Sequence, residues 1–463
     1  MENFTFKLQK EEKCPLYQQL YHEIIGEMEA GRLREGEKLP SKRALCAHLG
    51  VSRSTVETAY GMLTAEGYLR AVPKSGYYVS AALERASGQR EPQRELPEHA
   101  PEAPRRYDFS TGAVDTSIFP YASWARLSRE VISRDPRLLQ RGQVQGDADF
   151  RQTLAEFLRE YHGVRCHREQ IVVGAGLEYL LSVVVQLLPE DSVYGLEDPG
   201  YGALWQTLGN HHRRAVPIPL DSGGMEPEAL EQSGAQVAFV TPSHQFPTGS
   251  TMPVGRRQRL LQWAAEGAGR YLIEDDYDSD FRYTSRPIPA MQGMDQQGRV
   301  IYVGTFSRSI APGIRCAYLV LPEALLPVYR SRFGFAASTV SRFEQQTLRL
   351  FLEQGLYGRY LRRMTILCRR KQQLLVTELR QRLPEAVISG QEAGLHFLLT
   401  LPGRDGSRLA ERCRAQGLPV HSLSEYRVAP APPEGTLVLG FAGLSLEEIP
   451  QAAQALQNAL TGE

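Results

Sequence analysis

The chain has 463 residues, which is too long for one ordinary domain, so two or three compact units are expected. Its composition, 42% hydrophobic and 23% charged, is typical of a soluble globular protein, and its formal net charge of +0 points to neither a nucleic-acid nor a membrane partner. Six widely spaced cysteines without a CxxC pair favour reduced thiols over a disulfide framework or a structural zinc. No leader and no membrane-spanning apolar run is found, so a cytoplasmic location is expected.

Residues 1–80 predict three helices and a hairpin. Apolar residues recur every four positions over 16–28, and Gly31 closes that helix. Ser41 can cap a short helix over KRALCAHL, and Ser52 can cap another that ends near Gly67. The run YLRAVPKSGYYV then predicts two short strands around a turn.

The two capped helices suit DNA binding, because the tight LGVSR turn presents the N-terminus of the second helix to a major groove. Donors for phosphates and base edges cluster there, at the start of the preceding helix, and at the hairpin tip. The residues expected on DNA are Lys42, Arg43, Ser52, Arg53, Ser54, Thr55, Lys74 and Gly76. The alternative is a small protein-binding domain, since residues 1–80 hold 11 Lys or Arg against 10 Asp or Glu.

The run LPSKRALCAHLGVSRSTVETAYGMLTAEGYLRAVPKSGYYV resembles the GntR-type winged helix-turn-helix along its whole length. The shared motifs are LPS-x-R, LGVSR-x-TV, AY-x-x-L-x-x-EGYL and SG-x-YV. The resemblance implies a double-stranded DNA operator as partner. It places Arg43 and residues 52–55 on that DNA, and Lys74 and Gly76 in the wing.

Residues 81–106 are rich in Pro, Glu, Arg and Gln without apolar periodicity, which predicts a flexible linker. In 107–322, β-prone runs alternate with helical ones such as 177–188 and 256–266. This pattern predicts an α/β domain, a mainly parallel sheet with helices on both faces. The expected strands are 171–173, 237–241, 271–274, 300–303 and 317–321.

Residues 323–463 predict a smaller α+β part with connecting helices. Two long helices divide near Gly355, and three short strands follow, near 395–401, 420–423 and 437–441. The capping box Ser445-Leu-Glu-Glu448 then starts a final helix.

Four segments of the larger domain carry chemistry. VVGAGLEYLL can hold a phosphate on the amides of Ala175 and Gly176, and TPSHQFPTG is a polar loop after a strand. EDDYDSDFRY puts several carboxylates at the ligand edge of the sheet, where Asp275, Asp276 and Asp278 could instead bind a metal. VGTFSRSIAPGIR offers hydroxyls and arginines that suit a phosphate monoester.

Together, DPGY, TPSHQFP, EDDYDS and GTFS-x-S-x-APG-x-R resemble the fold-type I aminotransferases, and most closely the sensor domain of MocR/GabR regulators, over about residues 107–463. The resemblance implies a pocket for pyridoxal phosphate. Asp275 would pair with its pyridine nitrogen, Tyr277 would bond its 3-oxygen, and Tyr201 would stack on its ring. The implied phosphate ligands are Thr305, Ser307, Arg315 and the amides of Ala175 and Gly176.

The chain departs from the family at Arg308, which stands where FSKS has its lysine. A lysine amine can lose its proton and attack an aldehyde, whereas a guanidinium with a pKa above about 12 stays protonated. Lys371, the only other lysine beyond Lys74, lies in the charged helical run LCRRKQQ and is not expected to substitute. Aminotransferase activity is therefore not expected, and no residue is assigned a catalytic role.

Two interpretations of this pocket stay open. In the first, pyridoxal phosphate or its adduct with an amine binds without a covalent bond, and Arg308 lies near the phosphate or the aldehyde oxygen. In the second, the pocket binds a different ligand and keeps the old residues for packing. Aminotransferases often carry a carboxylate-binding arginine where this chain has Val438, and Arg427 is a nearby alternative.

The preferred hypothesis is a homodimeric transcription regulator in which a small-molecule effector gates DNA binding, with no membrane or metal partner. The rivals are an active pyridoxal phosphate-dependent aminotransferase with a DNA-binding appendage, and a constitutive DNA-binding dimer with a degenerate pocket.

Overall fold

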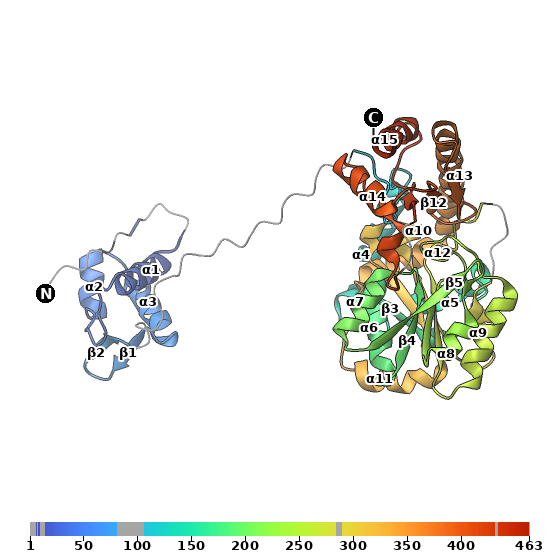
Figure 1. Ribbon diagram of the computed structural model, residues 1–463. Coiled ribbons are helices and arrows are strands. Elements are labelled where there is room, and N and C mark those ends of the chain that lie inside the picture. Colours follow the sequence, from blue (N-terminus) through green and yellow to red (C-terminus); the bar gives the residue numbers. More distant parts are fainter. Residues whose placement is uncertain are drawn as a thin grey trace. The chain divides into compact units, whose positions relative to one another are not determined.

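The computed structural model describes residues 6, 8–9, 14–80, 106–283, 289–430 and 434–462. Contacts divide the chain into two compact units, Met1–Glu102 and Ala103–Glu463 (Figure 1). The predicted linker lies outside the described residues except for Arg106, whose amide donates to the carbonyl of Gly417 at 2.9 Å.

The first unit has three helices and a hairpin, as predicted. Ser41 and Ser52 cap the second and third helices by accepting from backbone amides at 3.2 Å. The core forms where Leu20 and Ile24 of the first helix pack with Tyr60 of the third. The elements are α1 (Leu16–Glu29), α2 (Lys42–Leu49), α3 (Arg53–Ala65), β1 (Leu69–Val72) and β2 (Gly76–Val79).

The second unit is built on an eight-stranded sheet with the order β3-β10-β9-β8-β7-β4-β5-β6. Strands β9, β8, β7, β4 and β5 run parallel, whereas β10 is antiparallel to both its neighbours and β6 is antiparallel to β5. The sheet is therefore mixed but mainly parallel. Its strands are β3 (Ile171–Gly174), β4 (Val193–Asp198), β5 (Arg214–Asp221), β6 (Gly224–Met225), β7 (Val237–Val240), β8 (Tyr271–Asp276), β9 (Val300–Thr305) and β10 (Ala317–Val320).

Helices cover both faces of this sheet (Figure 1). Successive strand residues point to opposite faces, so Ile273 packs in the core with α6, α7 and α11, while Leu272 packs in the core with α8 and α9. A third core joins α5 and α12 to the sheet. The helices are α4 (Tyr121–Arg134), α5 (Ala148–Tyr161), α6 (Leu177–Leu187), α7 (Gly202–Asn210), α8 (Pro227–Gln232), α9 (Val254–Glu266), α10 (Phe306–Ser309), α11 (Leu326–Phe333) and α12 (Arg342–Glu353).

The C-terminal part has a four-stranded antiparallel sheet, β11-β12-β14-β13, packed on helices. Gly355, with φ 63°, separates α12 from the next helix, as predicted. Ser445 and Glu448 exchange the expected side chain-to-amide hydrogen bonds before the last helix. The elements are α13 (Leu356–Arg382), β11 (Val387–Ser389), β12 (His396–Thr400), α14 (Gly406–Ala415), β13 (His421–Ser422), β14 (Thr436–Gly440) and α15 (Ile449–Thr461).

Four strands were not predicted from the sequence: β4, β5 and β6 in the large sheet and β11 in the small one. All six cysteines lie within the described residues and are free thiols. Among the described residues, no helix combines the length and the apolar character needed to cross a membrane.

Candidate functional site

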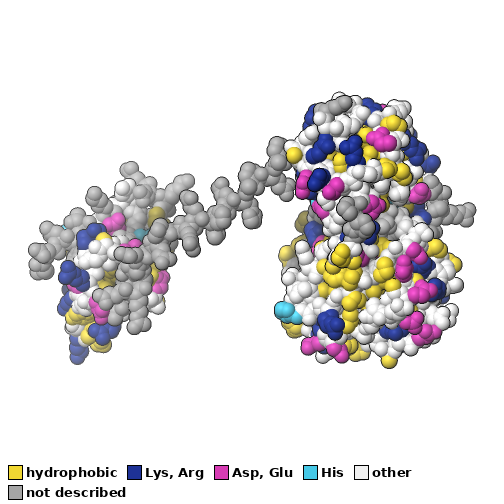
Figure 2. All heavy atoms as spheres, viewed as in Figure 1, with side chains coloured by type: hydrophobic (Ala, Val, Ile, Leu, Met, Phe, Trp, Pro, Cys, Tyr) yellow, Lys and Arg dark blue, Asp and Glu magenta, His cyan; other side chains and the backbone are white. Residues whose placement is uncertain are grey.

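The N-terminal unit presents polar and basic groups at the start of α3. The side chains of Arg43, Ser52, Arg53 and Ser54 are exposed, and Ser52 Oγ lies 2.8 Å from both Ser54 Oγ and Thr55 Oγ1. Three of the groups expected on DNA therefore share one hydroxyl cluster at a helix N-terminus. Figure 2 shows lysine and arginine side chains gathered along one edge of this unit.

The basic side chains at the start of α2 and α3 form salt bridges but can still bind a phosphate. Arg53 pairs with Glu57 at 3.0 Å while its side chain stays 78% exposed, and Lys42 lies 3.6 Å from the same carboxylate. Pairs this exposed are weak, so a DNA phosphate or base edge can replace the carboxylate.

The hairpin carries the predicted wing residues and one that sequence reasoning missed. Lys74 lies in the β1–β2 turn with φ 62°, and Gly76 starts β2 with φ 130°. Lys38 forms a β-bridge with Tyr78 and its ammonium lies 5.8 Å from the centre of that ring. Lys38 precedes α2 by four residues and has no motif to identify it, so only the fold places it beside the wing.

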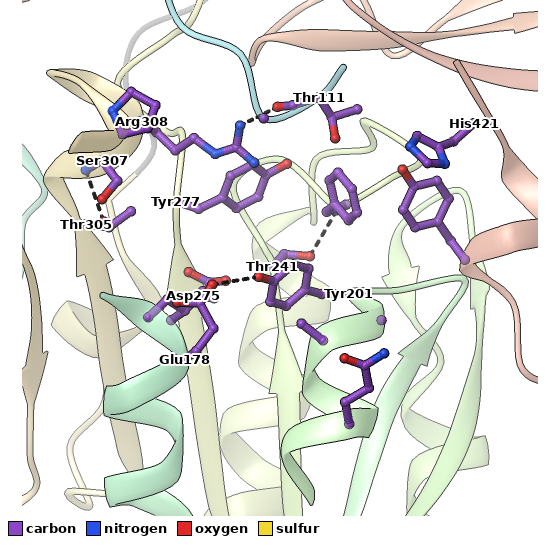
Figure 3. Close-up of a pocket in the computed structure, with 18 of the residues that line it drawn as sticks. Thr111, Glu178, Tyr201, Thr241, Asp275, Tyr277, Thr305, Ser307, Arg308 and His421 are labelled. Carbon is purple, nitrogen blue, oxygen red and sulfur yellow. Dashed lines mark hydrogen bonds between the residues drawn. The ribbon is translucent and has the colours of Figure 1, made fainter. Parts of the chain in front are cut away.

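In the second unit, a cavity of about 570 Å³ opens at the carboxyl ends of the parallel strands (Figure 3). Residues at or just beyond the ends of β4, β7, β8 and β9 line it, together with loops at 111–112 and 421–426. Seven of the nine residues predicted to bind the cofactor line this cavity: Tyr201, Asp275, Tyr277, Thr305, Ser307, Arg308 and Arg315.

Asp275 is the acidic group on the cavity floor. It is the second-last residue of β8 and is 4% exposed. Its Oδ1 is buried without a hydrogen-bond partner. Burial, reinforced by the charges of Asp276 and Asp278, raises the pKa of this carboxyl well above its usual range. A protonated ring nitrogen would supply both the missing donor and the missing counter-charge.

Tyr277 lines the same cavity, and its hydroxyl contacts a buried histidine. Its hydroxyl lies 3.1 Å from His244 Nδ1, which is also 2.9 Å from Asp278 Oδ2. His244, Asp278 and His396 form the one group of potential metal ligands found among the described residues. His396 Nε2 bonds the carbonyl of Pro247 at 3.1 Å. These hydrogen bonds indicate that the cluster positions Tyr277.

The predicted metal rival, Asp275 with Asp276 and Asp278, does not form a common site. Asp276 accepts from Tyr302 at 2.6 Å and contacts His162 at 3.2 Å, whereas Asp278 faces His244. Asp276 and Asp278 therefore have separate partners, and Asp275 shares neither of them.

The other end of the cavity offers hydroxyls and an arginine. Thr305 Oγ1 accepts from the amide of Ser307 at 3.1 Å, while Ser307 Oγ is buried without a partner. Arg315 Nη2 lies 3.2 Å from Glu178 Oε2, and the hydroxyl of Tyr201 donates to Glu178 Oε1 at 3.2 Å. Glu178 was not predicted, and a bound phosphate would compete with it for Arg315.

Ala175 and Gly176 adjoin this end without lining the cavity. Gly176 has φ 104°, a conformation that favours glycine, and a Cβ there would lie 2.2 Å from Arg315 Nη2 and would force that guanidinium to move. The amides of the two residues already donate to Thr339 Oγ1 at 3.0 Å and to the carbonyl of Gly174 at 2.9 Å. A phosphate that used these amides would have to replace both acceptors.

Arg308 extends over Tyr277 and donates through Nη1 to the carbonyl of Thr111 (Figure 3). Lys371, by contrast, is 1% exposed and bonds Asp115 Oδ2 at 2.6 Å and the carbonyl of Ala442 at 3.0 Å. Neither Lys371 nor its partners line the cavity. The described lining therefore contains no lysine.

The position that aminotransferases often fill with arginine is apolar in this fold. Val438 is 1% exposed in β14 and packs with Leu398 and Leu423. Arg427, the predicted alternative, lies 3.6 Å from Glu434 and does not line the cavity.

Sequence reasoning missed several lining residues besides Glu178. They come from segments without a motif, and their shared feature is a position in loops that the fold returns to the sheet edge: Thr111, Gly112, His421, Glu425 and Tyr426.

Residues in both units match known families. Residues 16–79 match the profile described as bacterial regulatory proteins of the gntR family, and residues 107–456 match aminotransferase class I and II. The uncharacterized HTH-type transcriptional regulator YdeL of Bacillus subtilis is 37% identical over 96% of both chains.

Two further relatives have more specific names. The HTH-type pyridoxine biosynthesis transcriptional regulator PdxR of Corynebacterium glutamicum is 32% identical over 95% of both chains. The probable rhizopine catabolism regulatory protein MocR of Rhizobium meliloti is 31% identical over 98% of this chain and 95% of its own.

Among solved structures, LysN, the α-aminoadipate aminotransferase of Thermus thermophilus, matches with a TM-score of 0.68 and 26% identity over 77% of this chain and 92% of its own. An archaeal alanine:glyoxylate aminotransferase matches with a TM-score of 0.71 and 23% identity over 77% of this chain and 91% of its own. These neighbours support the fold assignment of the second unit.

Proposed function

The chain belongs to the MocR/GabR type of GntR-family transcription regulators, and we propose that its aminotransferase-like domain senses pyridoxal phosphate, or an adduct of it with an amine, bound without a covalent bond. The chain is thus a DNA-binding regulator, and the proposal concerns what its second domain detects. The DNA partner follows from the GntR family, whereas the ligand is argued from the cavity.

The observation that carries the proposal is a pair of unpartnered buried polar atoms in one cavity. Asp275 Oδ1 and Ser307 Oγ both lack hydrogen-bond partners, although unpaired buried polar groups are costly. A ligand with a ring nitrogen at one end and a phosphate at the other would satisfy both. The PdxR relative is named a pyridoxine biosynthesis regulator, which makes this ligand class a reasonable one.

Six of the lining residues would hold such a ligand. Asp275 would pair with the ring nitrogen, Tyr277 would bond the ring hydroxyl, and Tyr201 would pack on the ring. Ser307, Thr305 and Arg315 would hold the phosphate, with Glu178 released from Arg315. Pyridoxal phosphate contributes an aldehyde and an electron-withdrawing ring, but no lysine lines the described cavity to attach it.

We propose, for that reason, that the domain does not catalyse transamination. The guanidinium of Arg308 cannot give up a proton to attack an aldehyde at neutral pH. The amine of Lys371 is bonded to Asp115, and neither residue lines the cavity. Binding and release then remain as the functions of the cavity.

We also propose a homodimer as the active form. Operators with two half-sites are read by paired recognition helices, so a dimer would present two copies of α3 to one operator. Ligand occupancy of the second domain would then change how well the two helices fit their half-sites.

Calorimetric titration of the full chain with pyridoxal phosphate tests the ligand. We expect binding to the wild-type chain and an affinity at least about tenfold lower for Asp275→Asn, because the amide lacks the counter-charge for a protonated ring nitrogen. Asp191→Asn, an exposed acidic residue after α6, is the matched control. Absence of binding heat at high concentration would favour a constitutive DNA-binding dimer.

A further inference from the structure

Arg308 is a cation in the cavity without an anionic partner. Its one hydrogen bond within the described structure goes to a carbonyl, that of Thr111, and it forms no ion pair with a described carboxylate. None of its nitrogens is among the buried unpartnered atoms, so its remaining N–H groups open into the cavity. Arg315, the other arginine in the lining, is already paired with Glu178.

None of the described carboxylates near the cavity forms an ion pair with Arg308, since Asp278, Glu178 and Glu425 pair with His244, Arg315 and His421. Burial favours the neutral form of Asp275, whose pKa is raised well above its usual range. Glu425, at the far side of the cavity, bonds Arg414 Nη1 at 2.9 Å and His421 Nδ1 at 2.8 Å. Because a half-buried cation without a counter-charge is unfavourable, the missing charge points to a ligand.

The direction of Arg308 separates it from the phosphate end. Its side chain runs over Tyr277 toward Thr111, away from Ser307 and Thr305 (Figure 3). An anion held by Arg308 would therefore be a second anionic group of the ligand, distinct from the phosphate. A planar guanidinium fork matches a carboxylate through two parallel hydrogen bonds.

Among the described lining residues, no other basic side chain lacks an acidic partner and could bind such a carboxylate. Val438 is buried among apolar residues and does not line the cavity, and Arg427 pairs with Glu434 outside the cavity. The basic side chains of the lining are Arg308, Arg315 and His421, and the last two already contact Glu178 and Glu425.

We propose that Arg308 is the carboxylate receptor of this cavity, and that the ligand recognised best is a phosphopyridoxyl adduct of an amino acid. The substitution that removes the lysine thus supplies a binding group for the amino acid's carboxylate. This inference rests on the proposed function, since it assumes that the phosphopyridoxyl moiety occupies the cavity.

The test compares two stable reduced ligands that differ in one group. N-(5′-phosphopyridoxyl)-L-leucine carries the carboxylate, and N-(5′-phosphopyridoxyl)-3-methylbutylamine is the same molecule without it. Titrated calorimetrically into the wild-type full chain, the leucine adduct should bind about tenfold tighter or more. In Arg308→Gln this preference should fall to within about twofold, whereas in the control Arg427→Gln it should persist.

The outcomes separate the two proposals. Equal affinity of the two adducts for the wild-type chain would overturn the role of Arg308 while leaving the ligand class intact, and this comparison needs no variant. A carboxylate preference that survives in a folded Arg308→Gln would assign the carboxylate to another group. Binding of neither adduct, nor of pyridoxamine phosphate, would overturn the proposed function itself.

Discussion

At the residue scale, the exchange of lysine for Arg308 decides which chemistry the cavity supports. We expect Arg308→Lys to restore covalent attachment of pyridoxal phosphate, because the other lining residues keep their positions around residue 308. Borohydride treatment followed by mass spectrometry should find the added mass on the peptide that contains residue 308.

The wild-type chain provides the control for this prediction, since it retains Lys371. Treated in the same way, it should gain no mass, because Lys371 is buried against Asp115 and the carbonyl of Ala442. A wild-type adduct on Lys371 would contradict the account of the cavity as lysine-free.

His162 makes the stability of the second unit depend on pH. Although burial opposes charging, its hydrogen bond with Asp276 at 3.2 Å and the nearby charge of Asp280 raise its pKa from 6.5 to about 9. Ser279 Oγ and Glu274 also face this imidazole. The raised pKa stabilises the folded state fully below about 6.5, and this contribution is lost as the pH rises through about 9.

His162→Gln should remove that dependence. The free energy of unfolding of the wild-type second unit should fall relative to the variant by up to about 3 kcal/mol between pH 6.5 and pH 9, as followed by urea denaturation. His211→Gln, at the C-terminus of α7, is the control. A variant that loses stability with pH as steeply as the wild-type chain would show that this imidazole does not titrate in the window.

Seven lining residues were predicted from sequence motifs, but the directions of their side chains were not. Asp275 and Thr305 could be placed because they lie within the last two residues of parallel strands, whose carboxyl ends meet at one edge. The contact of Arg308 with Thr111 could not be predicted, because it joins segments 197 residues apart. Glu178 was missed for a related reason: its role depends on Arg315, which the fold brings to the start of α6.

At the element scale, helix caps were predictable and some strands were not. Ser41, Ser52 and Gly50 define helix ends through local hydrogen bonds and backbone conformation, so nearby sequence suffices. Strand β5 contains Pro217 and Pro219, which normally argue against a strand. They are accommodated because the neighbour on one side, β6, pairs only with the last two residues of β5.

The direction of β10 is a further property of the whole sheet. The run 317–321 was identified as a strand, but its antiparallel pairing with β3 and β9 depends on how the chain crosses the sheet. Apolar periodicity is the same for both directions, so the sequence predicted a mainly parallel sheet without locating the exception.

Helix α3 carries the most direct prediction about DNA. Arg53 is exposed at its N-terminus, so Arg53→Ala should weaken binding to a specific operator by about 10- to 100-fold and relax its sequence preference. Fluorescence anisotropy with an operator selected from random DNA measures both effects.

The matched control is Arg408→Ala, which removes an arginine that is 85% exposed on α14 of the second unit. Its operator affinity should stay within about twofold of the wild-type value. Unchanged affinity in Arg53→Ala would contradict the assignment of α3 as the recognition helix.

At the scale of the whole molecule, a formal net charge of +0 does not show how charged groups are distributed between the two units. Basic groups of the first unit gather at α2, α3 and the wing, whereas the second unit buries Asp275 in a cavity that also holds the unpartnered hydroxyl of Ser307 and the guanidinium of Arg308. Ligand binding in the second unit can regulate the first only if the ligand has different affinities for the DNA-bound and free states.

The most direct test of the central claim is therefore the affinity of the full chain for its selected operator with and without pyridoxal phosphate or the leucine adduct. The account predicts that a saturating ligand changes this affinity by about fivefold or more in the wild-type chain and has a much smaller effect in Asp275→Asn. An operator affinity that stays the same while calorimetry shows the cavity filled would contradict ligand-gated DNA binding.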